Sequence, residues 1–215
     1  ADALAVEKVS QQIMSTISTF AAATEGSGAS AADAFSTALA SVVEVVQQKS
    51  VAFQSDSTVK LDFSSSTDLA SIQNNVTTKA ATVSGVDQTA LATMANDTAT
   101  AIKNVNDKID TVSDLTSDAS KNVFSTTQVL SEQVETAAKT EAAGGTGSIE
   151  FVNTAKIDSA AANAAPTDIS LSASTISEGA GSLIIGSFST TDDQESSSFT
   201  YRLASVEGTD HASFN

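Results

Sequence analysis

Apolar residues recur at every third or fourth position through most of residues 1–143, and this spacing predicts amphipathic helices. The first helix is expected over about 3–23, ending at the glycines that follow. Ser30, with Asp33 three residues later, predicts the N-cap of a second helix. The expected buried stripes are Val6, Val9, Ile13, Ile17 and Phe20 in the first helix, and Phe35, Leu39, Val42, Val43 and Val46 in the second.

The spacing changes to two over residues 51–63. Val51 and Phe53 are separated by polar residues from Val59, Leu61 and Phe63. This alternation favours a short β-hairpin inserted between helices. The other interpretation is an extended loop whose apolar side chains cover one end of a helical bundle.

Helical spacing returns after residue 63. A third helix is expected over 68–83, a fourth after the cap residue Asp87, and a fifth over 117–143. The fourth helix carries a heptad-like seam, in which we expect the Thr98 hydroxyl to bond to a carbonyl one turn earlier. The seam consists of Ala95, Thr98, Ile102, Val105, Ile109 and Val112. Five such helices with short links predict an antiparallel bundle over residues 1–143.

Four acidic residues follow each other at steps of three and four near the end of the fourth helix. These are Asp107, Asp110, Asp114 and Asp118. An unbroken helix would place them on one face. They would then form either a cation-binding ridge or, as is more usual for such runs, a solvated face.

The pattern changes again at the glycine-rich stretch that starts at Gly144. Residues 144–165 are interpreted as a linker or extended segment. Over residues 166–215 apolar side chains alternate in short runs separated by Gly and Asp, which indicates β-strands. The predicted fold class is therefore α+β, an antiparallel helical bundle followed by a β-sandwich-like part.

Residues 163–215 resemble the first half of a bacterial cadherin-like repeat. The resemblance lies in four segments in the family's order: 163–172 (NAAPTDISLS), 176–179 (ISEG), 185–192 (IGSFSTTD) and 199–203 (FTYRL). Residues 210–214 (DHASF) look like the family's next strand. It implies a calcium-binding β-sandwich module of a large surface adhesin. The helical part is similar, more loosely, to Ala-, Ser- and Thr-rich segments beside such repeats in giant secreted proteins.

The resemblance also implies calcium ligands, since calcium binds carboxylate and carbonyl oxygens. Glu178 matches the acid after the family's first strand, and Asp192 matches the first acid of its Asp-x-Asp turn. Asp193 and Glu195 flank Gln194, which stands where the second acid is expected. The alternative interpretation is that this turn is a solvated acidic loop without a metal.

A sandwich of this type needs about 100 residues, and the chain continues for only about half of that after Pro166. Two expectations follow for residues 166–215. The chain is a fragment of a longer repeat, or a second subunit completes the sheet by strand addition.

The amino-acid composition narrows the classes of function that this chain could have. The chain has 215 residues, with 10 Lys and Arg against 26 Asp and Glu, a net charge of −16. This charge argues against binding to nucleic acid or to anionic lipid. With no Cys and a single His, His211, few side chains could act as nucleophile or acid–base catalyst near neutral pH.

These observations predict a non-enzymatic extracellular protein of a bacterial surface. We expect a subunit of a filament, matrix or adhesin whose partners are other copies of itself or adjacent modules of the same protein. The alternative is a calcium-dependent ligand- or glycan-binding module. The scarcity of aromatic residues (5%) counts against glycan binding, because sugar sites usually present aromatic faces.

Overall fold

The computed structural model describes residues 2–162, 168–172 and 187–191. The chain divides into two units, residues 1–162 and 163–215. The described part of the first unit consists of six α-helices and one 3₁₀ turn. These are α1 (Asp2–Gly26), α2 (Ala31–Ser55), α3 (Ser66–Ala80), α4 (Gln88–Asp110), α5 (Asp118–Ala142), η1 (Glu150–Val152) and α6 (Thr154–Ala162).

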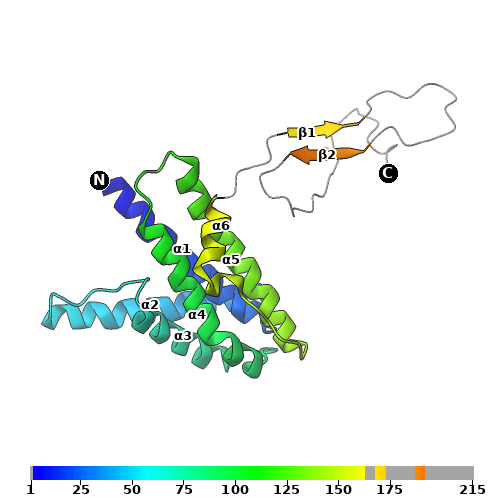
Figure 1. The fold of residues 1–215 in the computed structure, drawn as a ribbon. Helices are drawn as coiled ribbons and strands as arrows, with labels where there is room; N and C mark the ends of the chain where they lie inside the picture. Colours follow the sequence, from blue (N-terminus) through cyan, green and yellow to red (C-terminus); the bar gives the residue numbers. More distant parts are fainter. Residues whose placement is uncertain (1, 163–167, 173–186, 192–215) are drawn as a thin grey trace, which may run out of the picture. The chain divides into compact units, whose positions relative to one another are not determined.

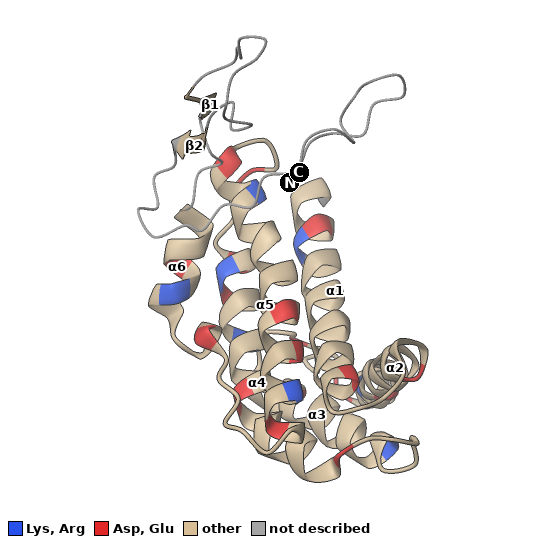
Figure 2. Cartoon of the chain, turned by 90° about the vertical axis from the view of Figure 1, so that its right-hand side faces the viewer, with Lys and Arg blue, Asp and Glu red and all other residues tan. Residues whose placement is uncertain are grey.

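Three long helices, α1, α4 and α5, lie side by side, and α2 and α3 cross one end of them (Figures 1 and 2). Helices α1 and α4 are antiparallel, since Lys8 contacts Asp110 and Thr16 contacts Asn106. Helices α1 and α5 run in the same direction, because Thr19 meets Ser131 while Gly26 lies against Ala138. The predicted antiparallel five-helix bundle is therefore wrong in its arrangement. Three helices form the bundle, and the α2–α3 pair reverses the chain across its base.

The seam predicted in α4 is confirmed from Thr98 onward, whereas its first member, Ala95, is only half-buried and Met94 is buried instead. Ile102, Val105 and Ile109 are fully buried, and Thr98 and Val112 are buried with them. They pack into one core with the apolar faces of α1, α3 and α5. The expected bond of Thr98 is not formed, because its Oγ1 has no partner in the part of the chain that the structure describes.

Several predicted helix starts are also confirmed by capping hydrogen bonds. The Ser30 hydroxyl accepts from the Asp33 N–H at 3.2 Å, and Asp87 Oδ1 accepts from the Thr89 and Ala90 N–H groups at 2.9 and 3.0 Å. Each of these side chains satisfies backbone donors that the first turn of a helix leaves without partners.

The hairpin predicted over residues 51–63 is wrong. No helix-breaking residue precedes Asp56, so α2 continues through Val51 and Phe53 to Ser55. The Asp56 carboxylate then accepts from the Thr58 hydroxyl and N–H at 2.6 and 2.9 Å and turns the chain. The rest of the segment is a loop that places Phe63 in the core, as the second interpretation of this segment expected.

The segment 144–165 is not a free linker up to residue 162. Gly147 lies so close to α5 that a Cβ there would be 2.3 Å from the Ala137 carbonyl oxygen. Beyond it, Ile149, Phe151 and Ile157 are buried against the bundle, and Asn104 Nδ2 donates to the Phe151 and Val152 carbonyls at 3.1 and 3.0 Å. The helical unit therefore extends to residue 162, because these apolar side chains complete its core.

The described residues of the second unit form one antiparallel ribbon of two strands, β1 (Asp168–Leu171) and β2 (Phe188–Thr191). Leu171 pairs with Phe188 and Ser170 with Ser189. A sandwich requires two packed sheets, and the described strands supply a single ribbon. The predicted α+β class with a partial cadherin-like sandwich is thus wrong for the described chain, which is mainly helical.

Candidate functional site

The sequence-predicted calcium ligands Glu178, Asp192, Asp193 and Glu195 all lie outside the described residues. Calcium binding there stays a prediction. Within 2–162, 168–172 and 187–191, no group of three or more carboxylate or imidazole side chains is placed to hold a metal ion.

The cation-binding ridge, one of the two interpretations of the acidic residues at 107–118, is not formed because the helix is not continuous. Helix α4 ends at Asp110 and α5 begins at Asp118, so the four carboxylates do not share a face. Asp107 forms an ion pair with Lys103 at 2.5 Å, and Asp118 forms one with Lys121 at 2.9 Å. Asp107 and Asp118 are thus exposed carboxylates with one local ion pair each.

Asp110 belongs to a polar layer that joins α1, α4 and the loop before α3. Its Oδ1 accepts from Gln12 Nε2 at 2.9 Å, and its Oδ2 accepts from the Ser64 hydroxyl at 3.0 Å. Deeper in the same layer, Asn106 Nδ2 donates to the Phe63 carbonyl at 2.8 Å and to Thr16 Oγ1 at 3.3 Å. The layer therefore fixes the loop before α3 against the bundle.

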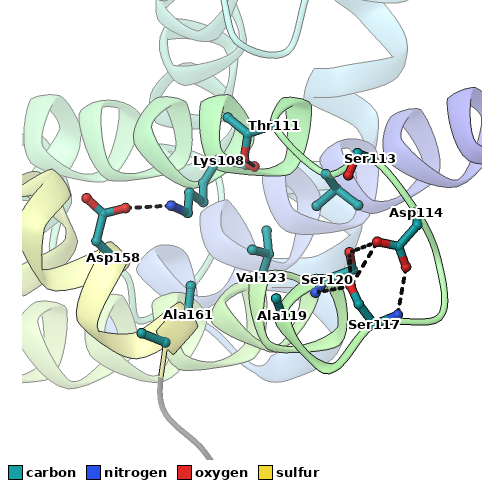
Figure 3. A pocket seen from close by; sticks show the side chains of 12 residues that line it. Lys108, Thr111, Ser113, Asp114, Ser117, Ala119, Ser120, Val123, Asp158 and Ala161 are labelled. Carbon is teal, nitrogen blue, oxygen red and sulfur yellow. Dashed lines mark hydrogen bonds and ion pairs between the residues drawn. The ribbon is translucent and has the colours of Figure 1, made fainter.

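A depression of about 420 Å³ lies between the end of α4, the start of α5 and α6 (Figure 3). On one side the Lys108 ammonium pairs with Asp158 at 2.6 Å. On the other side are Asp114 and the first turn of α5, with Ser117 and Ser120. The depression thus has hydroxyls and a carboxylate close together, a combination that could suggest nucleophilic catalysis.

Hydrogen bonding excludes Asp114 as a general base at neutral pH. Its Oδ1 accepts from the backbone N–H groups of Ser117 and Thr116 at 2.7 and 2.8 Å, and its Oδ2 accepts from the Ser117 hydroxyl at 2.9 Å. These bonds, with the Ser117 N–H first, lower the pKa of Asp114 to about 2. A carboxylate with so low a pKa cannot deprotonate a serine efficiently. Asp114 forms a turn that positions Ser117, the N-cap of α5, whose hydroxyl accepts from the Ser120 N–H at 3.3 Å.

The most unusual feature of the helical unit is the outer face of α2, which we define as Phe35, Leu39, Val43, Val46 and Phe53. These side chains are between 39% and 51% exposed. The sequence analysis placed the first four of them in the core, and that prediction is wrong. The residues of α2 that face α1 and α3 are smaller ones, including Ala34, Ala38, Ser41, Val42 and Val45.

Close packing explains why the small-residue face of α2, and not the face with Phe35 and Leu39, is buried. Small side chains let α2 approach its neighbours closely, and two ion pairs fix it to α3, Lys49 with Asp68 at 2.5 Å and Glu44 with Lys79 at 2.9 Å. Asp68 is buried, so its carboxylate requires the partner. The sequence does contain a signal for this face, a stripe of Ala and Ser that runs beside the larger apolar residues. Both stripes have helical spacing, so spacing alone does not show which of the two is buried.

Exposed apolar side chains also occur on α1, where Val6 and Val9 of the predicted stripe and nearby Met14 are about half exposed or more. No helix in the described chain is both long enough and apolar enough to cross a bilayer.

Comparison of the chain with protein-family models, with characterised proteins and with solved structures gave no match.

Proposed function

We propose that this protein is a non-enzymatic structural component of a bacterial surface, a subunit of an extracellular filament, matrix or adhesin, and that its helical unit is an assembly module. The observation that carries the proposal is the outer face of α2. A well-packed helical scaffold holds this row of apolar side chains toward solvent, and such rows are characteristic of protein interaction surfaces.

The surface chemistry supports a structural role over a glycan-binding one. Many exposed threonines donate their hydroxyl to the carbonyl one turn earlier, as Thr78 does to Asn74 at 2.8 Å and Thr100 to Asn96 at 2.8 Å. These hydroxyl protons are therefore engaged within the helices. A net charge of −16 keeps such a surface soluble at high local concentration.

Calcium binding and strand addition remain part of the proposal. Both concern residues 166–215, where β1 and β2 support the expectation of extended structure. The melting temperature of the full chain should rise with millimolar calcium by mass action. The rise should vanish in Asp192→Ala, and no rise in the wild type would remove calcium from the proposal.

The location is tested on intact cells of the organism of origin. Antibodies raised against the helical unit should label the cell surface or the surrounding matrix, and protease added outside the cells should remove the labelling. A cytosolic protein serves as the control for cell integrity. Labelling that requires permeabilised cells would overturn the proposed function.

A further inference from the structure

The outer face of α2 forms one continuous stripe. Its members follow each other at steps of four, four, three and seven residues, so they align on one side of a helix with 3.6 residues per turn. The helix is about 37 Å long at 1.5 Å per residue. A partner helix lying along α2 would cover the whole stripe.

The second half of α2 extends away from the rest of the helical unit (Figure 1). Val45 is the last buried residue, and from Val46 to Ser55 every residue except the half-buried Lys49 is exposed. Short helical segments gain most of their stability from packing. A helix end of this length, with Phe53 at 51% exposed, is what we expect where another helix packs in the assembled state.

Charge indicates what kind of partner fits. Within α2 the only charged residues are Asp33, Glu44 and Lys49, and the last two are paired with α3. The stripe itself is uncharged, so it offers nothing to attract a strongly basic or acidic partner. A second copy of this chain, although its net charge is −16, would meet little repulsion at this uncharged face.

A two-fold contact requires the stripe to pair with itself, and its central members Val43 and Val46 do so when two copies of α2 lie antiparallel. When two α2 helices lie antiparallel with the axis between Glu44 and Val45, Val43 faces Val46 of the second copy, and Leu39 faces Ser50. Phe35 then lies beside Phe53 of the second copy. Two valine pairs thus meet in the middle, a leucine meets a serine on each side of them, and aromatic rings lie near each other at both ends.

We infer that two copies of this protein associate through the outer faces of their α2 helices, antiparallel and related by a two-fold axis near Glu44 and Val45. This inference rests on the proposed function and gives it a first assembly step. The stripe exposes roughly 400 Å² on each copy, about half of a standard interface. An interface of this size belongs to the weak, transient class, so the dimer should form only at the higher protein concentrations.

The test is sedimentation velocity of the full chain from about 1 to 200 µM, with circular dichroism to verify that each variant is folded. The wild type should pass from monomer to dimer. Val43→Glu should weaken dimerisation at least about tenfold, because two carboxylates would be buried beside the axis. Val129→Glu is the matched control, since Val129 is an equally exposed valine on α5, and it should dimerise like the wild type.

A charge exchange tests the register. The double variant Val43→Lys/Val46→Glu brings opposite charges together across the axis and should restore the dimer that Val43→Glu loses. A wild type that stays monomeric over the whole range, as it would if residues 163–215 covered α2 within the same chain, would overturn the inference. So would a Val43→Glu variant that dimerises normally. Neither result affects the surface labelling that tests the proposed function.

Discussion

The same substitution, threonine to valine, should change the free energy of unfolding in opposite directions at two buried positions of this protein. Thr98 in α4 and Thr16 in α1 are both at most 1% exposed. The Thr98 Oγ1 has no hydrogen-bond partner among the described residues. The Thr16 Oγ1 donates to the Gln12 carbonyl at 2.8 Å and accepts from Asn106 Nδ2 at 3.3 Å. Replacement by valine keeps the shape of each side chain and removes only the hydroxyl.

The expected magnitudes follow from desolvation. A buried hydroxyl without a partner costs about 1–3 kcal/mol, so Thr98→Val should raise the free energy of unfolding by about 1–2 kcal/mol. For a unit of this size the melting temperature should rise by about 2–8 °C. Thr16→Val should lower the free energy of unfolding by about 1–2 kcal/mol, because the Asn106 amide loses an acceptor.

The assay is thermal and urea unfolding of the full chain, followed by the helical circular dichroism signal, which reports on the unit that contains both residues. The wild type and the two variants are compared at one protein concentration, because dimerisation would shift the midpoints. A lower midpoint for Thr98→Val would refute the reasoning. It would mean that the hydroxyl has a partner in solution, such as the carbonyl of Met94 one turn earlier.

Two further predictions concern the ends of helices. The pKa of Asp114 is lowered to about 2, so its contribution to stability should be complete above the unfolded value near 3.9 and lost as the pH falls toward 2. The difference in melting temperature between the wild type and Asp114→Ala should therefore shrink over that range. A difference independent of pH would contradict the role of the Asp114 carboxylate in the turn before α5. Gly28 has a φ of +113°, and a Cβ there would lie 2.3 Å from the Gly85 carbonyl oxygen, so Gly28→Ala should destabilise the protein by more than about 2 kcal/mol. Gly144→Ala, with a φ of +80° and open space around it, is the control and should cost about 1 kcal/mol in urea unfolding; equal losses would show that the close approach of the two glycine backbones is not decisive.

Local chemistry made the helices of this protein predictable. The caps at Ser30 and Asp87 and the seam around Ile102, Val105 and Ile109 were correctly placed, because they depend on residues within one or two turns of each other. The wrong prediction of a hairpin over residues 51–63 also came from local spacing. Val51 and Phe53 alternate like strand residues, and only the absence of a breaker before Asp56 shows that α2 continues.

The sequence by itself determined where most helices of the unit 2–162 begin and end, and that the chain is acidic, cysteine-free and poor in catalytic side chains. Only the tertiary structure decided which side of α2 is buried. Apolar residues cover two neighbouring sides of that helix, and the prediction from local spacing places the larger ones in the core. Close approach of α1 and α3, with the ion pair of Lys49 and Asp68, selects the small residues instead. That choice depends on helices distant in the sequence, and it leaves Phe35, Leu39 and Val43 at the surface.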